Sequence, residues 1–293
     1  MFLLAHLSDL HMASPPRLYE LAGKRGLGFI NWQRQRKSIH RPEVLEAITR
    51  DVKAAGADHI AVTGDLVNLS LNDEYARARA WLKRLGAPTD ITVVPGNHDV
   101  YVRGARACPS TYWGDYMRGD VDYWPNPFPI LRRRGDVALI AVSSAVPSGP
   151  FLATGRVEDK PLALLGEMLE ETAGLFRIVL IHHPPISPPS RYLRRLVDAA
   201  ALRRVLADKG AELLLHGHDH RHALVWLEGP RGTRIPAVGV PSASASAPHG
   251  SEDGAGYNLF RIDGQAPRWS CELIGRQRAD DGTIRQGAPQ RLQ

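Results

Sequence analysis

Three polar residues, Asn97, His98 and Asp99, directly follow the apolar pair Val93-Val94 and the turn pair Pro95-Gly96. An amide oxygen, an imidazole and a carboxylate in succession can hold a cation or move a proton. A buried strand that ends in such residues is typical of open α/β sheets, whose sites lie at the carboxyl ends of the strands. Taken alone, the three residues are also compatible with an ordinary turn.

Four other predicted strands end in residues of the same kind. The strands cover residues 2–7, 59–63, 178–181 and 212–215, and the residues that follow them are Asp9 and His11, Asp65, His182, and His218 with His220. Side chains alternate along a strand, so Asp9 and His11 can turn toward one ion. Together with Asn97 there are seven candidate ligands, more than the roughly three protein ligands of a catalytic zinc. They suit two ions, roughly 3.5–4 Å apart, that share a bridging carboxylate.

The elements that must position these residues alternate between strands and helices. Helices are predicted over residues 42–55 and 73–85, and each lies between two of the first three strands and ends at a glycine. This order argues for an α/β sheet with right-handed crossover connections. Further on, strands are predicted over 137–142, 178–181 and 212–215, with helical stretches from 159 and over 192–209.

The last quarter of the chain has a different pattern. Short β-like runs cover residues 222–227, 234–240, 257–262 and 269–274, and they suggest a second, mostly antiparallel sheet. Residues 276–293 are polar and are predicted to be disordered.

The net charge of +6 belongs to one segment, residues 17–41, which we call the basic segment. It holds seven basic residues against Glu20, while the rest of the chain has 30 basic and 30 acidic residues. The basic residues are Arg17, Lys24, Arg25, Arg34, Arg36, Lys37 and Arg41. Mixed with Phe29 and Trp32, they suit a lid over an anionic ligand or a membrane-surface element, and a surface helix pair packed on the body explains them equally well. The balanced remainder has no long basic stripe, which argues against nucleic acid as a partner.

Cysteine usage and hydropathy predict a cytoplasmic protein. Cys108 and Cys271 are far apart and match no metal-binding spacing, which favours a reducing compartment. No apolar run approaches the roughly 18 residues of a membrane span. Residues 1–5 lack the basic start and the apolar length of a signal peptide, and they are predicted to begin the first strand. If the basic segment binds lipid, the protein would be peripheral at the inner face of the membrane.

The motifs Asp-x-His, Gly-Asp-x-x-Asn, Gly-Asn-His-Asp, His-x-Pro and Gly-His-x-His occur in this order between Asp9 and His220. This pattern resembles the calcineurin-like metallophosphoesterases. The resemblance implies an α/β fold over residues 1–275, a four-layer α/β/β/α sandwich with two mixed sheets and a metal site at the carboxyl ends of the strands. It also implies which residues hold the metals: Asp9, His11 and His220 one ion, Asn97, His182 and His218 the other, and Asp65 both.

The resemblance further implies a dinuclear phosphoesterase with two divalent ions, foremost Mn, Fe or Zn. A metal-bridging hydroxide would attack a phosphodiester or pyrophosphate bond. His98 would stabilise or protonate the leaving oxygen, and Asp99 would orient the His98 imidazole. The substrate expected is a cyclic nucleotide or a nucleotide-linked lipid such as UDP-diacylglucosamine. The alternatives are a phosphomonoesterase, a nuclease, or an interaction module that shares the fold without catalysis.

Overall fold

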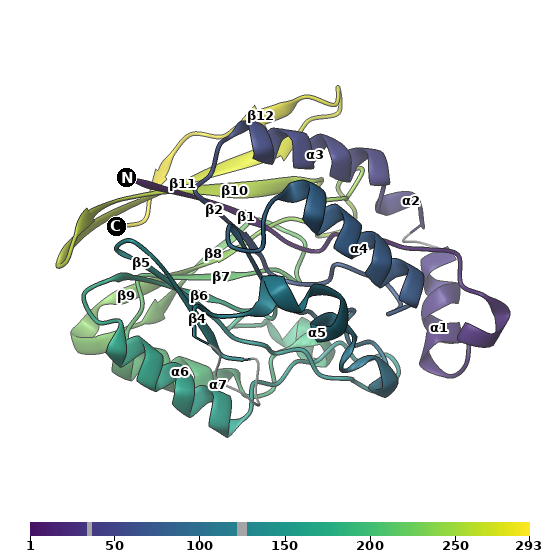
Figure 1. Ribbon diagram of the computed structural model, residues 1–293, viewed down its shortest axis with the longest axis horizontal. Coiled ribbons are helices and arrows are strands. Elements are labelled where there is room, and N and C mark those ends of the chain that lie inside the picture. Colours follow the sequence, from purple (N-terminus) through teal and green to yellow (C-terminus); the bar gives the residue numbers. More distant parts are fainter. Residues whose placement is uncertain (34–36, 122–127) are drawn as a thin grey trace.

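Two β-sheets face each other in the computed structural model, and helices cover their outer faces (Figure 1). The structure describes residues 1–33, 37–121 and 128–293. Helices α3 and α4 lie on the first sheet, and α6 and α7 lie on the second. The predicted four-layer α/β/β/α sandwich with two mixed sheets is confirmed.

The first sheet has the strand order β12-β11-β10-β1-β2-β3, with β13 also paired to β11. Its strands are β1 (Phe2–Leu7), β2 (His59–Val62), β3 (Ile91–Val93), β10 (Gly256–Gln265), β11 (Arg268–Arg278), β12 (Ile284–Gln286) and β13 (Gln290–Arg291). Strands β1, β2 and β3 are parallel, and β10 runs antiparallel to β1. The carboxyl ends of the three parallel strands therefore meet at one end of the sheet.

The second sheet has the order β4-β5-β6-β7-β9-β8. Its strands are β4 (Ile130–Arg134), β5 (Val137–Ala141), β6 (Phe176–Leu180), β7 (Leu213–His216), β8 (Ala223–Glu228) and β9 (Arg234–Gly239). The central four strands are parallel, and the two edge strands, β4 and β8, are antiparallel to their neighbours. This sheet too has a single end at which its parallel strands finish.

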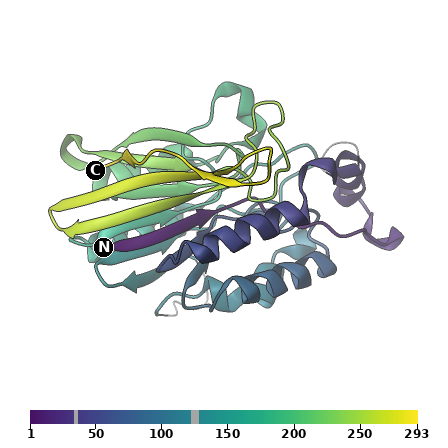
Figure 2. The same cartoon turned by 90° about the horizontal axis from the view of Figure 1, so that it is seen from above.

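Helices α3 and α4 lie side by side over the first sheet (Figure 2). The helices are α1 (Lys24–Asn31), α2 (Lys37–Ile39), α3 (Pro42–Ala54), α4 (Asn72–Leu85), α5 (Cys108–Trp113), α6 (Asp159–Glu171) and α7 (Ala199–Lys209), with 3-10 turns at Leu18–Glu20, Arg103–Ala105, Gly114–Met117, Pro189–Arg194 and Pro230–Gly232. Pro42 opens α3 at its first turn, and Ile48 and Val52 point into the core. Within the described ranges, no helix combines the length and the apolar character that a membrane crossing requires.

The central strands are buried on both faces, which fixes their register. In β6, Ile178 and Leu180 pack between the two sheets, whereas Val179 packs toward α6 and α7. Strands of this kind read as continuous apolar runs in the sequence. Because a slip of one residue would exchange the two faces, the residues that follow each strand are placed with little freedom.

Two predictions about the second half of the chain are wrong. The short β-like runs after residue 220 form no sheet of their own: β8 and β9 extend the second sheet, and β10 and β11 extend the first. The predicted helix over 192–209 begins only at Ala199, because the backbone is extended at Arg195 and Leu196 forms a β-bridge with Gly155.

The prediction of disorder for residues 276–293 is also wrong. Strand β11 continues to Arg278, β12 and β13 pair with it, and the Leu292 side chain is only 5% exposed. Backbone groups, not apolar side chains, hold most of this segment in place. The polar composition that suggested disorder says nothing about such backbone pairing.

Candidate metal centre

The seven predicted ligands come together at the carboxyl ends of five strands. The loops after β1, β2, β3, β6 and β7 carry them, and each of the seven side chains is 4% exposed or less. Polar groups buried this deeply need partners, and here they mainly have one another. The side chains form two groups joined by Asp65.

The first group consists of Asp9, His11 and His220, and we call it the Asp9 group. The Nε2 atoms of His11 and His220 lie 3.0 Å apart. Oδ1 of Asp9 lies 3.2 Å from Nε2 of His220 and 3.7 Å from Nε2 of His11. Ligands at about 2.1 Å from one ion are roughly 3 Å apart when they are adjacent. The three atoms therefore have the spacing of ligands that share a cation.

The second group consists of Asn97, His182 and His218, and we call it the Asn97 group. Nε2 of His182 lies 3.3 Å from Oδ1 of Asn97 and 3.2 Å from Nδ1 of His218. Oδ2 of Asp65 lies 3.4 Å from the same His182 nitrogen. Ligand atoms of Asp65 also lie within 4.8 Å of those of Asp9 and of His11. Asp65 thus stands between the two groups.

Hydrogen bonds on the outer side of three imidazoles decide which nitrogen faces inward. Nδ1 of His182 donates to the Thr63 carbonyl at 2.6 Å, and Nε2 of His218 donates to the Arg194 carbonyl at 2.8 Å. Nδ1 of His220 lies 2.8 Å from the Glu252 carboxylate. A nitrogen that donates carries the proton, so in the neutral ring the other nitrogen turns its lone pair to the centre. Metal-binding histidines are held in this way.

Five of the seven residues have a positive φ, which non-glycine residues rarely adopt. They are Asp9 (56°), His11 (46°), Asp65 (54°), His218 (71°) and His220 (52°). Such backbone costs of order 1–3 kcal/mol per residue and persists only where the surroundings impose it. This strained backbone directs the five side chains toward one point, and strain of this kind is typical of functional sites.

Two motif glycines make room for these loops. A Cβ on Gly96 would overlap Oδ1 of Asp65, and a Cβ on Gly217 would overlap the Ser8 hydroxyl. The glycines of Gly-Asn-His-Asp and Gly-His-x-His are thus fixed by close packing against the site itself.

The site is electrostatically prepared for positive charge. Burial lowers the pKa of His182, but the Asp65 carboxylate outweighs burial and raises this pKa to about 9. Burial likewise lowers the pKa of His220, but the carboxylates of Asp9 and Glu252 together outweigh burial and raise this pKa to about 9. Burial raises the pKa of Asp65, but His182 and His98 outweigh it and hold this pKa well below its ordinary value. The buried carboxylates therefore favour a proton or a metal cation beside them.

The donor set fits divalent transition metals. Carboxylates, an amide oxygen and imidazoles without a thiolate suit Mn, Fe, Zn, Co or Ni. Asn68 further indicates a site for an oxygen-bearing ligand. This residue lines a cavity beside the two groups, and its buried Nδ2 has no hydrogen-bond partner in the described part of the chain. An acceptor oxygen in that cavity would satisfy it.

The sequence profile of calcineurin-like phosphoesterases matches residues 2–222, which include both groups and Asp65. The chain belongs to the calcineurin-like phosphoesterase family. The resemblance seen in the motifs is thereby confirmed, and so is the enzyme class at the level of the family, metal-dependent phosphoric ester hydrolases.

Several relatives of the family are similar to this chain. It is 27% identical to a probable cyclic nucleotide phosphodiesterase of Rhodococcus erythropolis over 74% of its own length and 64% of that protein, so it spans less than two thirds of this relative. It is 28% identical to the 3′,5′-cyclic adenosine monophosphate phosphodiesterase CpdA of Pseudomonas aeruginosa, over 91% of its own length and 84% of that protein. A cAMP/cGMP dual specificity phosphodiesterase of Mycobacterium tuberculosis is 27% identical, over 84% and 67% respectively.

Solved structures share the fold. A dimetal phosphatase from Danio rerio superposes with a TM-score of 0.57 at 13% identity, covering 97% of this chain and 98% of that one. A purple acid phosphatase from yellow lupin (Lupinus luteus) seeds has a TM-score of 0.61 at 12% identity, covering 97% of this chain and 52% of that one.

His98 and Asp99 follow Asn97 in the motif Gly-Asn-His-Asp, and their side chains have different surroundings. Nδ1 of His98 donates to the Asn68 carbonyl at 2.6 Å, which leaves Nε2 as the acid–base nitrogen. The Asp99 carboxylate instead accepts hydrogen bonds from the amides of Val67 (3.0 Å) and Gly96 (2.8 Å). The expectation that Asp99 orients the imidazole is therefore corrected: a backbone carbonyl does so, while Asp99 ties the β2 loop to the β3 loop.

A cavity of about 340 Å³ opens beside the two groups, and we call it the metal cavity. His98 and Asn68 line one side of it, and the basic segment contributes Lys24 and His40. The basic segment therefore forms part of the wall of this cavity. Arg34 and Arg36 lie outside the described residues.

Sequence reasoning missed several residues at this cavity: His40, Glu252, Arg194 and Tyr101. None follows a buried strand of apolar residues, which was the signal used for the others. The only signal for His40 was its place in a basic, aromatic segment directly after Asp9 and His11. His183 and His216 were not predicted as ligands. His183 forms a hydrogen bond with Ser144 Oγ, and His216 forms one with the Gly217 carbonyl.

Proposed function

We propose that this protein is a dinuclear metal-dependent phosphodiesterase and that a 3′,5′-cyclic nucleotide is its substrate. The observation that carries the proposal is the position of Asp65 between the Asp9 group and the Asn97 group, as a shared ligand requires. The similar proteins named as cyclic nucleotide phosphodiesterases support the substrate. The Asp9 group would hold one ion and the Asn97 group the other, with Mn, Fe or Zn foremost.

Bound ions would lower the pKa of a water nucleophile and neutralise charge on the phosphate oxygens. The protein's own part begins with His98, whose Nε2 is turned away from the Asn68 carbonyl. A protonated His98 next to Asn97 can deliver a proton to the leaving oxygen or stabilise its charge. Asn68 Nδ2 can donate a hydrogen bond to a phosphate oxygen in the same cavity.

The metal cavity also offers positive charge from the protein. Lys24 and Arg194 line it, and Nζ of Lys24 is held at 3.0 Å from the Ser148 carbonyl and 4.2 Å from the centre of the Tyr101 ring. A cation in this place suits an anionic phosphodiester. The volume of about 340 Å³ lies at the small end of ligand pockets, which suits a compact mononucleotide.

The first experiment reconstitutes the protein with Mn²⁺, Fe²⁺ or Zn²⁺ and compares hydrolysis of 3′,5′-cyclic AMP, bis-p-nitrophenyl phosphate and p-nitrophenyl phosphate. Metal-dependent cleavage of the two diesters, with the cleavage of cyclic AMP collapsing in His98→Ala, supports the proposal. Cleavage of the monoester alone would identify a phosphomonoesterase, and cleavage of single-stranded DNA in preference to cyclic AMP would identify a nuclease. A protein that binds no metal and cleaves nothing would be an interaction module.

A second cavity favours a nucleotide-linked lipid as the alternative substrate. It measures about 520 Å³, it is lined by Leu10, Leu45 and Trp81, and it shares His11 and His40 with the metal cavity. An apolar space beside the metal centre could take an acyl chain of a lipid-linked diphosphate. Cleavage of UDP-diacylglucosamine at a higher kcat/KM than cyclic AMP would establish this alternative.

Peripheral membrane contact through the basic segment is a further part of this alternative, at the cytoplasmic face. Leu18 and Tyr19 are 90% and 73% exposed, as a lipid contact requires. Two basic residues of the segment, however, are turned toward the protein: Lys24 to Ser148, and Arg25 to the carbonyls of Leu69 and Ser70. Sedimentation with anionic vesicles should therefore fall in Leu18→Glu, and equal sedimentation of this variant and the wild type would refute the membrane contact.

A further inference from the structure

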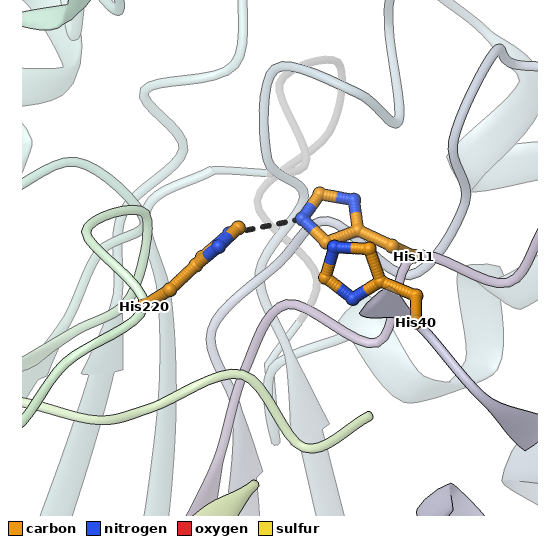
Figure 3. A group of neighbouring side chains, drawn as sticks. All are labelled: His11, His40 and His220. Carbon is orange, nitrogen blue, oxygen red and sulfur yellow. Dashed lines mark hydrogen bonds between the residues drawn. The ribbon is translucent and has the colours of Figure 1, made fainter. Parts of the chain in front are cut away.

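His40 joins the Asp9 group from the end of the basic segment. One ring nitrogen of each of His11, His40 and His220 lies within 4.8 Å of the other two. The His40 ring centre is 4.5 Å from that of His11 and 5.7 Å from that of His220. Figure 3 shows the three imidazoles gathered at one point, with His40 against His11 and His220 facing them.

The backbone around His40 is fastened to the loop that follows β9. Residue 40 forms a β-bridge with Ala245, the Arg41 amide donates to the Ser244 carbonyl at 2.9 Å, and the Ser246 amide donates to the Ile39 carbonyl at 2.7 Å. These contacts place the His40 ring at the metal cavity independently of the rest of the segment.

The ring itself is oriented by a hydroxyl. Nδ1 of His40 lies 2.9 Å from Oγ of Ser244 and 3.4 Å from Oγ of Ser242. The Ser242 hydroxyl donates in turn to the Asp9 carbonyl at 2.6 Å. Because Nδ1 is held by Ser244, Nε2 is the ring nitrogen that would bind an ion. The outer contacts of His182 and His220 orient those rings in the same manner.

We propose that His40 is an additional ligand of the ion that the Asp9 group would hold, which rests on the proposed dinuclear function. Opposite nitrogen ligands of one ion are about 4.2 Å apart, twice a bond of about 2.1 Å. The Nε2 atoms of His11 and His220 lie 3.0 Å apart, and a ring nitrogen of His40 lies within 4.8 Å of a ring nitrogen of each, so little movement is needed for the three to share an ion. The ion would then be held by three imidazoles together with the carboxylates of Asp9 and Asp65. The ion of the Asn97 group would be held by the imidazoles of His182 and His218.

Two consequences follow from this ligand. A third imidazole shifts the preference of this position toward metals that favour nitrogen, such as Fe, Zn, Co and Ni. It also links the basic segment to the metal, because His40 lies nine residues beyond the end of α1 and two residues before the start of α3. Metal binding then stabilises the wall of the cavity in which the substrate lies.

The test measures metal binding by the full-length protein without substrate. Metal-free wild type, His40→Gln and His249→Gln are titrated with Co²⁺ against a chelating dye, and the visible absorption of the bound Co²⁺ is recorded. His249 is the matched control, because it also lines the metal cavity but is exposed and lies outside the three-histidine group. Ser244→Ala, which removes the partner of Nδ1 and keeps the imidazole, is titrated as well.

We expect His40→Gln to bind one of its two ions at least about tenfold more weakly, with a stronger absorption band because the coordination number falls. Ser244→Ala should weaken the same ion by a smaller factor, and it carries the test if His40→Gln does not fold. His249→Gln should match the wild type. Equal affinity and equal spectra for wild type, His40→Gln and Ser244→Ala would overturn the ligand role of His40. A wild type that binds fewer than two ions would instead refute the dinuclear function.

Discussion

Nδ1 of His98 donates a 2.6 Å hydrogen bond to the backbone carbonyl of Asn68. The amide of His98 meanwhile donates at 2.7 Å to Oδ1 of Asp65, the carboxylate proposed to join the two ions. One hydrogen bond thus fixes the His98 ring and the other fixes its backbone, so together they set the position of the imidazole relative to the proposed metals. A carbonyl partner also keeps the proton on Nδ1 in the neutral ring, so the proton that His98 can donate is on Nε2.

If His98 protonates the leaving oxygen, the loss in His98→Ala must depend on how basic that oxygen is. For cyclic AMP, whose leaving group is an alkoxide, we expect kcat to fall by about 10²–10⁴. For bis-p-nitrophenyl phosphate, whose phenolate leaves without help, the loss should be about tenfold. Steady-state kinetics on both substrates decide the point, with metal content measured as a control. Equal losses on both would show that His98 transfers no proton to the leaving oxygen.

Asp99 should act on stability and on the placement of loops. Its carboxylate accepts hydrogen bonds from the buried amides of Val67 and Gly96, and Asp99→Ala leaves both without a partner. Each such group costs about 1–3 kcal/mol, so the free energy of unfolding, measured with urea, should fall by roughly 2–6 kcal/mol. Asp99→Asn keeps one acceptor and should lose less. A urea midpoint for Asp99→Ala equal to that of the wild type would refute this role.

Much of the fold could be predicted because the central strands are buried on both faces. The predicted strand over 178–181 and the observed β6 differ by two residues or fewer at each end, and only Ile181 separates the end of β6 from His182. Where an apolar run is followed by polar residues, the buried strand places these residues at the carboxyl end of the sheet. All seven candidate ligands met this condition, which is why they could be grouped before the structure was known.

The rest depends on contacts that leave no local pattern. His40 reaches the site by pairing with the loop around Ser244, 204 positions away in the chain. Asp99 was assigned to its sequence neighbour His98, but the turn in which the Asp99 amide donates to the Gly96 carbonyl directs its carboxylate to Val67 and Gly96 instead. Adjacent residues in a turn point in different directions, and only the backbone conformation decides where.

Glu74 in α4 should be essential for the loops that carry the site. Its carboxylate accepts hydrogen bonds from the amides of Ser14, Asn68, Leu69 and Leu71 and is fully buried. Glu74→Ala would leave these donors unsatisfied, and we expect a loss of at least about 3 kcal/mol in the free energy of unfolding. Glu74→Gln keeps an acceptor for the three donors on one oxygen and should retain most of the stability. If Glu74→Ala is as stable as Glu74→Gln in urea, the hydrogen bonds are not what holds these loops.

The same residue predicts a dependence of stability on pH. Burial raises the pKa of Glu74 from 4.5 to about 7, against the opposing effect of its amide donors. A carboxyl group with a raised pKa in the folded state stabilises fully below pH 4.5, and this contribution is lost as the pH rises through about 7. The wild type should therefore lose roughly 2–3 kcal/mol relative to Glu74→Gln between pH 4.5 and pH 8. Parallel stability curves for the two proteins would show that Glu74 does not titrate in this range.

Gly217 should not tolerate even a methyl group. A Cβ at this position would overlap the Ser8 hydroxyl and lie 2.5 Å from Oδ2 of Asp9, so Gly217→Ala must displace the Asp9 group. We expect a loss of about 1–3 kcal/mol in stability together with weaker metal binding. Gly114→Ala is the control, because nothing lies within 4 Å of a Cβ there and its φ is −47°. Calorimetry of both variants with and without metal tests this, and a normal metal-dependent rise in Tm for Gly217→Ala would contradict it.

Lys24 predicts how substrate binding depends on pH. Its half-buried position lowers the pKa of the ammonium from 10.5 to about 8, although Asp65 opposes the shift, and bound cations nearby would lower it further. The charged form therefore prevails below pH 8 and is lost as the pH increases. KM for a cyclic nucleotide should accordingly increase with pH, with a midpoint at about pH 8 or lower, while kcat changes little. Lys24→Arg keeps its charge throughout this range and should show a flat KM up to pH 9, whereas Lys24→Met should have a raised KM at every pH. Measurements of KM between pH 6 and pH 9 at constant ionic strength separate these cases. A rise in KM that persists in Lys24→Arg would assign the titration to another group and remove Lys24 from substrate binding.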